Sequence, residues 1–144
     1  MNPPPSGWPR ISSALFYREP LAAIDWLVRA LGFEVRIKVV GEDGALLHSE
    51  LTLDGGVVMV ASASADPVRR SPAAIGGGNT QSLMIYVDDV DALTERARAA
   101  GANIISEPKD TDYGADYWCD RGCEIEDPEG HRFWLVQRLR TAGA

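Results

Sequence analysis

A length of 144 residues with 45% hydrophobic side chains is typical of a single globular domain. The formal net charge of −7 at pH 7 argues against nucleic acid or an anionic membrane as a partner, because both bind basic surfaces. No stretch reaches the roughly 18 apolar residues of a membrane span, and residues 1–10 lack the apolar core of a signal peptide. We therefore expect a cytoplasmic protein, and its two cysteines do not make a disulfide scaffold.

An internal repeat organises the chain. Residues 13–32 align without a gap on residues 82–101, at a constant offset of 69. Each copy contains a strand, a helix start signal and an amphipathic helix, and it ends at a glycine, Gly32 or Gly101, suited to a left-handed C-cap. Further strands follow each copy. The sequence therefore predicts an α+β fold of two tandem βαβββ modules.

The predicted elements begin after a proline-rich arm, residues 1–10, which we expect to be disordered or extended, with Trp8 available to dock on a partner subunit. A first strand is predicted at residues 11–17, and apolar side chains at helical spacing follow from Leu21. The remaining strands of the first module are predicted at residues 33–40, 45–53 and 57–61.

The second module repeats this order after a small, Pro/Gly-rich linker. A strand at residues 81–87 leads to a helix at residues 90–100, which Asp88 or Asp89 is placed to cap. Later strands are predicted at residues 104–107, 117–126 and 132–136. The chain thus divides into an arm (1–10), a first module (11–62), a linker (63–80), a second module (81–138) and a tail (139–144).

Strand alternation assigns side chains to the two faces of each predicted sheet. Leu47, Leu51 and Leu53 are expected to pack on the helices, which places His48 and Glu50 on the opposite, open face. The same parity assigns to the open face Ser13, Leu15, Tyr17, Val57, Met59, Ser82, Met84, Tyr86, Arg121, Cys123, Arg132, Trp134 and Val136. Two such sheets facing each other would enclose a cup, which is the default place for a ligand.

A set of motifs accompanies this repeat. They lie at residues 87–92 (VDDVDA), 101–102 (GA), 113–114 (YG), 121–122 (RG) and 127–131 (DPEGH). Together with the double βαβββ pattern, they resemble the vicinal oxygen chelate superfamily, which includes glyoxalase I, the extradiol dioxygenases and the fosfomycin and bleomycin resistance proteins. The resemblance covers residues 11–138 and implies a cupped mixed β-sheet with helices on its outer face. It does not select one activity, because the fold hosts many functions.

The resemblance also implies where a metal would bind, because metal-using members take one ligand from the first and one from the last strand of each module. The matching positions here are Ser13, Met59, Ser82 and Trp134, where histidine or glutamate is usual. Their side chains are poor ligands for a divalent metal. We therefore expect neither a metal nor another cofactor.

Other residues leave alternatives open. His48 and Glu50 could bind a metal in a rearranged site, but a hydrogen-bonded role within the cup, or a pair with Arg121, is the simpler interpretation. The spacing of Cys119 and Cys123 matches no common zinc module. No nucleophile with a nearby base is evident, apart from serines in the cup near His48.

The leading hypothesis is a metal-free homodimer, similar to bleomycin resistance proteins, that binds a small aromatic or cationic molecule. The predicted ligand-binding residues are Tyr17, His48, Glu50, Met59, Ser82, Tyr86, Trp118, Arg121 and Trp134. One alternative is a metal-dependent lyase, isomerase or dioxygenase. Another is a metal-free enzyme with His48 or Glu50 as general base. Pairing of the modules within one chain and exchange between two chains are both consistent with the sequence.

Overall fold

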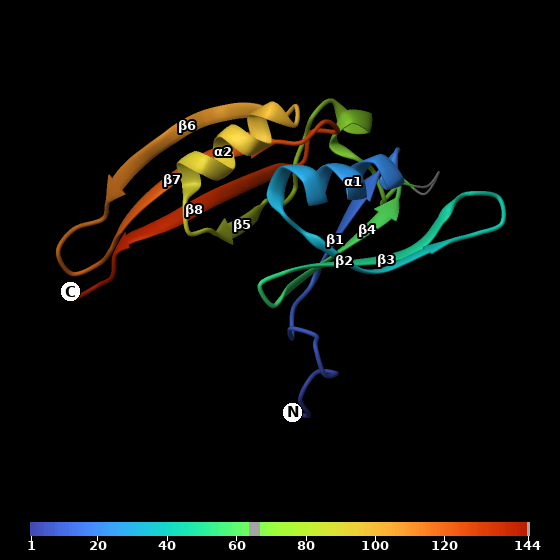
Figure 1. Ribbon diagram of the computed structural model, residues 1–144, viewed down its shortest axis with the longest axis horizontal. Helices are drawn as coiled ribbons and strands as arrows, with labels where there is room; N and C mark the ends of the chain where they lie inside the picture. The colour runs from blue at the N-terminus through green and yellow to red at the C-terminus, as the bar shows by residue number, and fades with distance from the viewer. Residues whose placement is uncertain (64–66, 144) are drawn as a thin grey trace. The chain divides into compact units, whose positions relative to one another are not determined.

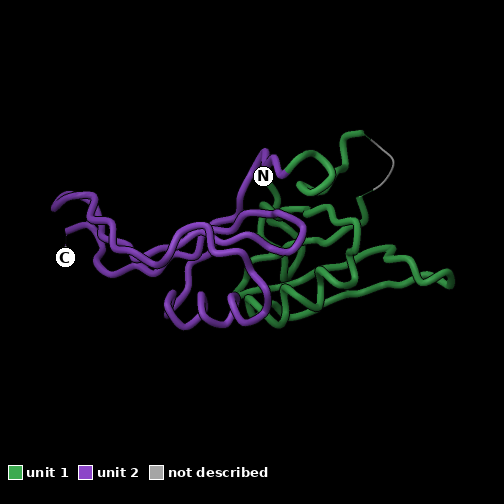
Figure 2. The backbone as a smooth tube through the Cα atoms, turned by 90° about the horizontal axis from the view of Figure 1, so that it is seen from above, with its two compact units in different colours: residues 1–76 green, residues 77–144 purple. Residues whose placement is uncertain are grey.

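The two modules build two separate sheets. The computed structural model describes residues 1–63 and 67–143, and the chain divides into two compact units, Met1–Gly76 and Gly77–Ala144 (Figure 2). The length alone favoured a single domain, whereas each module forms a unit with its own four-stranded mixed sheet and its own α-helix (Figure 1). The predicted α+β fold of tandem βαβββ modules is confirmed.

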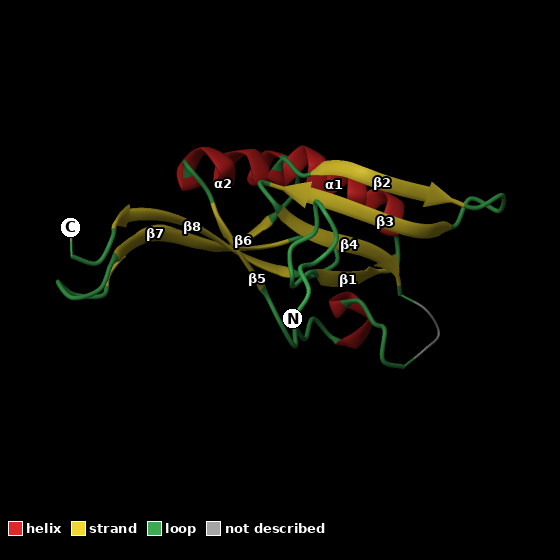
Figure 3. Cartoon of the chain, turned by 90° about the horizontal axis from the view of Figure 1, so that it is seen from below, coloured by secondary structure: helices red, strands yellow, loops and turns green. Residues whose placement is uncertain are grey.

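The sheet of the first unit has the strand order β1-β4-β3-β2, with β1 parallel to β4 and the other neighbours antiparallel (Figure 3). The elements of this unit are β1 (Ser13–Tyr17), α1 (Pro20–Leu31), β2 (Glu34–Val40), β3 (Leu46–Leu53) and β4 (Gly56–Ser62). Because β1 and β4 are parallel, the chain needs a crossover between them, and α1 supplies the first part of it.

The helix α1 packs against all the strands of the first sheet. It begins at Pro20, whose fixed φ suits the first turn of a helix. It ends at Leu31, and the following Gly32 adopts φ 80°. The backbone N–H of Gly32 donates to the Val28 carbonyl, and that of Phe33 donates to the Leu27 carbonyl. Within the described ranges, no helix is both long and apolar enough to cross a bilayer.

The sheet of the second unit has the equivalent order β5-β8-β7-β6, with β5 parallel to β8. Its elements are β5 (Leu83–Tyr86), α2 (Val90–Ala99), β6 (Asn103–Asp112), β7 (Cys119–Glu126) and β8 (Arg132–Arg140). Both β6 and β8 are longer than predicted, and β8 continues into the predicted tail. Cross-strand ion pairs accompany the extension: Arg138 binds Asp120, and an Arg140 nitrogen lies 2.7 Å from Asp112 Oδ1.

Of the predicted linker, the structure describes residues 63 and 67–80, and residues 64–66 lie outside the described residues. A short 3-10 helix, Pro72–Ile75, follows the fully buried Ser71. The guanidinium of Arg69 lies 5.8 Å from the ring centroid of Phe16 in β1. Residues 67–76 therefore belong to the first unit and contact its sheet.

The face assigned to β1 by the repeat is wrong. Leu15 and Tyr17 are 4% and 2% exposed, whereas Ala14 and Phe16 are only half-buried, so Ser13, Leu15 and Tyr17 share the face covered by α1. The parallel pairings explain the error, because Ala14 pairs with Met59 as Met84 pairs with Trp134.

The correct offset between the first strands is therefore 70, not 69. The helices also begin 70 residues apart, at Pro20 and Val90, and α1 is then longer than α2. The gap-free alignment of residues 13–32 on residues 82–101 matched the ends of the two helices, but it shifted β1 by one residue relative to β5. A shift of one residue assigns every side chain of the strand to the wrong face of the sheet. The first-strand equivalent of Ser82 is Ser12, rather than Ser13.

The predicted orientation of β7 is also wrong. Cys123 Sγ lies 3.1 Å from Thr94 Oγ1 in α2, and Arg121 forms ion pairs with Asp91 in α2 and Asp110 in β6. Arg121 and Cys123 therefore face the helix. Alternation correctly set the two side chains on one face but chose the wrong one, because a charged arginine suggested the open face, and the two aspartates make the helix-facing side acceptable to arginine.

A bulge accounts for a third difference. His48 pairs with Val39 and Leu46 pairs with Val40, so Leu47 has no partner in this register. Leu47 is 67% exposed, whereas Leu46 is 8% exposed. The predicted packing of Leu47 on the helix is therefore wrong.

The N-cap of α2 provides a test of this fold. Asp89 Oδ1 accepts a hydrogen bond of 2.9 Å from the backbone N–H of Ala92, so Asp89 is the capping residue. We expect Asp89→Ala to lower the free energy of unfolding by about 1 kcal/mol in urea denaturation. Asp88→Ala, which removes the neighbouring carboxylate, is the control; equal losses in the two variants would contradict the assignment.

Candidate functional site

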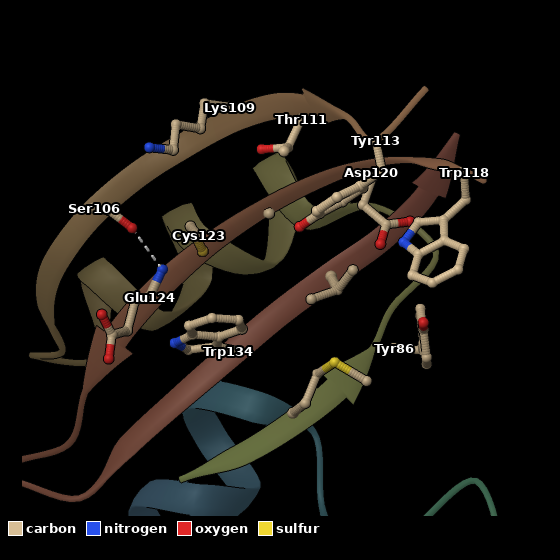
Figure 4. Close-up of a pocket in the computed structure, with 13 residues that line it drawn as sticks. Tyr86, Ser106, Lys109, Thr111, Tyr113, Trp118, Asp120, Cys123, Glu124 and Trp134 are labelled. Carbon is tan, nitrogen blue, oxygen red and sulfur yellow. Dashed lines mark hydrogen bonds between the residues drawn. The ribbon is translucent and has the colours of Figure 1, made fainter. Parts of the chain in front are cut away.

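A cavity of about 590 Å³ lies on the open face of the second sheet, opposite α2 (Figure 4). Every strand of this sheet contributes to its wall. The lining residues are Met84 and Tyr86 of β5, Ser106, Lys109 and Thr111 of β6, Asp120, Gly122, Cys123 and Glu124 of β7, Trp134 and Val136 of β8, and Tyr113 and Trp118 of the β6–β7 loop.

The floor of the cavity is apolar. Met84 pairs with Trp134 and Tyr86 pairs with Val136 across the parallel β5–β8 pair, so all of them point to the same side. Trp134 is 51% exposed and Met84 is 55% exposed within the chain. Large apolar side chains gathered at this level of exposure indicate a binding surface.

Gly122 keeps part of this floor low. It pairs with Val136, and a Cβ atom at this position would lie 3.3 Å from the Leu135 carbonyl oxygen and 3.8 Å from Val136 Cγ2. The first distance is tighter than an ordinary contact with backbone. A glycine therefore lets β7 and β8 approach and leaves space in the cavity.

One end of the cavity is closed by aromatic side chains from the β6–β7 loop. The backbone N–H of Tyr113 donates to the Trp118 carbonyl at 2.9 Å, and Gly114 between them adopts φ 105°. The rings of Tyr113 and Trp118 lie 5.7 Å apart, and Tyr117 meets Trp118 edge to face at 6.0 Å. This loop geometry places Trp118 at the rim.

A cation of the protein itself occupies the space between two of these aromatic rings. The Arg138 guanidinium carbon lies 5.4 Å from the centroid of Tyr86 and 5.1 Å from that of Trp118. Arg138 donates a 2.6 Å hydrogen bond to Tyr86 Oη and also binds Asp120. The bond to Asp120 raises the pKa of Arg138. The two rings are therefore already engaged in cation–π contacts.

A polar cluster lies on the open face of the first sheet. Arg36 Nε donates to Glu50 Oε2 at 2.8 Å, and His48 Nε2 lies 3.0 Å from Glu50 Oε1. The arm completes the cluster: Arg36 donates to the Gly7 carbonyl, and its guanidinium stacks 4.7 Å from the ring of Trp8. Glu50 thus pairs with His48 and Arg36 rather than with Arg121, and Trp8 docks on its own chain.

This cluster does not suit a general base. The hydrogen bond from His48, followed by that from Arg36, lowers the pKa of Glu50 below its ordinary value of 4.5. The carboxylate is then a weaker base than an ordinary glutamate. Arg36 and His48 instead stabilise the negative charge of Glu50, which is only 6% exposed.

The positions implied for a metal hold Ser12 in place of the predicted Ser13, together with Met59, Ser82 and Trp134. Hydroxyl, thioether and indole groups do not match the imidazole or carboxylate donors of divalent metals, so these residues do not fit such an ion. Across residues 1–63 and 67–143, no group of three or more His, Cys, Asp or Glu side chains is arranged to hold a metal. Burial raises the pKa of the Cys123 thiol, which disfavours the thiolate that binds zinc.

The structure brings only some of the predicted ligand-binding residues together. Tyr86, Trp118 and Trp134 meet in the cavity of the second unit. Ser82 is exposed on a neighbouring surface, in a hollow shared with Glu124. His48, Glu50 and Met59 belong to the first unit, and Tyr17 and Arg121 face the helices.

Sequence reasoning missed several residues of the cavity and its edge. They are Lys109, Asp120, Gly122 and Arg138. Alternation along β8 from Trp134 would have reached Arg138, but the predicted strand ended at residue 136. Lys109 lay outside the short strand predicted at residues 104–107.

The sequence and the structure of this chain are similar to those of known proteins. The profile of the Glyoxalase/Bleomycin resistance protein/Dioxygenase superfamily matches residues 11–135. The uncharacterized protein Rv0887c of Mycobacterium tuberculosis is 31% identical over 135 residues, which are 92% of this chain and 76% of that protein. TioX from Micromonospora sp. ML1 is 30% identical with a TM-score of 0.67, over 91% of this chain and 100% of TioX. TnmS3, an antibiotic binding protein from Streptomyces sp. CB03234, is 21% identical with a TM-score of 0.64, over 90% of this chain and 96% of TnmS3.

The Glu50 cluster predicts a pH dependence of stability. Since the pKa of Glu50 is lowered in the folded state, its ionised form stabilises the fold above the unfolded-state pKa, and this contribution is lost as the pH falls through the folded-state pKa, below 4.5. We expect Glu50→Gln to be less stable than the parent protein at neutral pH, by a difference that shrinks under acid. Urea denaturation across this pH range measures it, with the exposed Glu42→Gln as control. A difference that is constant with pH would contradict the prediction.

Proposed function

This chain belongs to the Glyoxalase/Bleomycin resistance protein/Dioxygenase superfamily, and we propose that it binds a small aromatic molecule, without a metal ion, on the open face of its second sheet. The exposed indole of Trp134 beside Met84 on the cavity floor is the observation that carries this proposal. A flat apolar surface of this kind gains free energy when an aromatic ring covers it.

The size and chemistry of the cavity support a small organic ligand. Its volume of about 590 Å³ falls within the roughly 300–1,000 Å³ of ligand pockets. Apolar side chains make the floor, and a few polar side chains from β6 and β7 surround it. In ligand pockets of this kind, the apolar surface supplies most of the affinity and the polar groups fix the orientation of the ligand.

The predicted alternatives receive less support. A metal-dependent lyase, isomerase or dioxygenase would require donors that Ser12, Met59, Ser82 and Trp134 do not provide. A metal-free enzyme with Glu50 as base would be slowed by the lowered pKa of that carboxylate. A cationic ligand would compete with Arg138 for the rings of Tyr86 and Trp118.

The known relatives are compatible with a binding function. TnmS3 is an antibiotic binding protein that shares this fold, so the fold can serve binding. We extend the proposal to an antibiotic-like aromatic molecule as the ligand. We also propose a cytoplasmic homodimer, because two-fold assemblies prevail among soluble oligomers.

Replacement of the floor indole tests the proposed site. We expect Trp134→Ala to weaken the binding of naphthamide, a neutral aromatic probe, by on the order of tenfold in calorimetric titration, because the stacking surface is lost. Leu139→Ala removes another exposed apolar side chain of β8, outside the cavity lining, and should leave the affinity unchanged. An unaltered affinity in Trp134→Ala would remove Trp134 from the site.

Metal titration tests the second part of the proposal. Protein washed with a chelator should bind no stoichiometric nickel, zinc, manganese or iron(II), because the family ligand positions lack suitable donors. Elemental analysis of the purified protein provides the independent measurement. Tight stoichiometric binding would refute a metal-free site, and its loss in His48→Ala would place the metal at the pair of His48 and Glu50.

A further inference from the structure

The charged side chains of the second-sheet cavity are paired, with one exception. Asp120 binds Arg138, and Glu124 Oε1 lies 3.4 Å from a guanidinium nitrogen of Arg132. Lys109 also lines the cavity, but its side chain forms no hydrogen bond or ion pair within the described part of the chain. The ammonium group of Lys109 therefore favours a negatively charged group in the cavity, although the whole chain is acidic with a net charge of −7.

The backbone fixes the side from which Lys109 approaches. Lys109 in β6 pairs with Gly122 in β7, and Gly122 pairs in turn with Val136 in β8. Residues paired across neighbouring strands point to the same face, so the Lys109 side chain rises on the cavity side of the sheet. Gly122 has no side chain to shield it from the floor around Trp134, and Figure 4 shows Lys109 on β6 along the edge of this floor.

Arg138 is less suited than Lys109 to bind an anionic group of a ligand. Asp120 neutralises the charge of its guanidinium, and Asp120, Tyr86 and Trp118 together hold the group in place. Lys109 has a flexible stem and an ammonium group without a protein partner, so it can adapt to an incoming anion. Thr111, the next residue of β6 in the cavity lining, adds a hydroxyl that can donate a hydrogen bond on the same side.

We propose that Lys109 binds an acidic group of the ligand, and that the ligand is therefore an aromatic acid carrying a carboxylate or an acidic phenol. The aromatic part covers Trp134 and Met84, and the acidic group lies toward β6. This inference rests on the proposed binding function and adds the charge of the ligand. It replaces the cationic ligand that the sequence left open with an anionic one.

The expected contribution of Lys109 is modest and sensitive to salt. Lys109 is exposed, and ion pairs of exposed lysines with carboxylates are weak in water. We expect an advantage of about two- to fivefold for an acid over its neutral amide at low ionic strength. The advantage should shrink at high salt, where exposed charges are screened.

The experiment compares three probes of one shape: naphthoate, its neutral amide naphthamide, and cationic naphthylmethylammonium. Each is titrated into the full-length protein in a calorimeter at low and high salt. The parent protein should bind naphthoate more tightly than naphthamide, and naphthylmethylammonium most weakly. Lys109→Gln should remove the preference for naphthoate without weakening the binding of naphthamide.

Lys38→Gln is the matched control, because Lys38 is the other lysine of the chain and pairs with the buried Ser49, on the helix-facing side of the first sheet. It should retain the preference for naphthoate. Equal affinities for the acid and the amide in the parent protein, both lost in Trp134→Ala, would overturn the role of Lys109 and leave the aromatic site standing. Failure of the parent protein to bind any of the probes would overturn the aromatic site together with this inference. An equal loss of preference in Lys38→Gln would also overturn it.

Discussion

Each sheet of this protein has a single α-helix to cover it, and that constraint determines where function can reside. A four-stranded sheet has two faces, and within its own unit only one of them can be buried against the helix. The buried faces are filled by aliphatic and aromatic residues such as Leu51 and Phe133, both fully buried. The side chains of the opposite face are therefore exposed to water unless a ligand or another protein surface covers them. Strand register therefore decides which strand residues can contact a ligand.

The two open faces have the same backbone plan but different chemistry. In the first unit, the Arg36–Glu50–His48 cluster and the arm residue Trp8 satisfy one another. In the second unit, Trp134 and Met84 remain largely exposed, without comparable internal cover. An internally satisfied polar cluster has little to offer a ligand, whereas exposed apolar surface gains free energy when covered. The asymmetry between the repeats therefore points to the second sheet as the binding surface.

Arginines hold this second sheet in shape. Arg121 joins Asp91 of α2 to Asp110 of β6, and these carboxylates raise its pKa, so it stays charged on the helix face. Arg138 joins Asp120 of β7 to the aromatic rim. Both contacts cross between elements far apart in sequence, and each leaves the arginine unable to serve as a free ligand contact. Among the residues that the structure describes, Lys109 is thereby left as the available cation of the cavity.

The sequence by itself determined the α+β fold, the tandem modules and the presence of Tyr86, Trp118 and Trp134 on one surface, because periodicity and turn signals are local properties of the chain. Only the tertiary structure decided which face Tyr17 and Arg121 occupy. Side chains alternate with a period of two, so a single extra helical residue or one bulge reverses a strand, and neither leaves a local signal. The partners of Glu50 and Arg138 were likewise fixed by strand pairing across long stretches of chain. Sequence reasoning therefore reached the correct fold and named some residues of the proposed site, whereas strand register decided which other residues lie beside them.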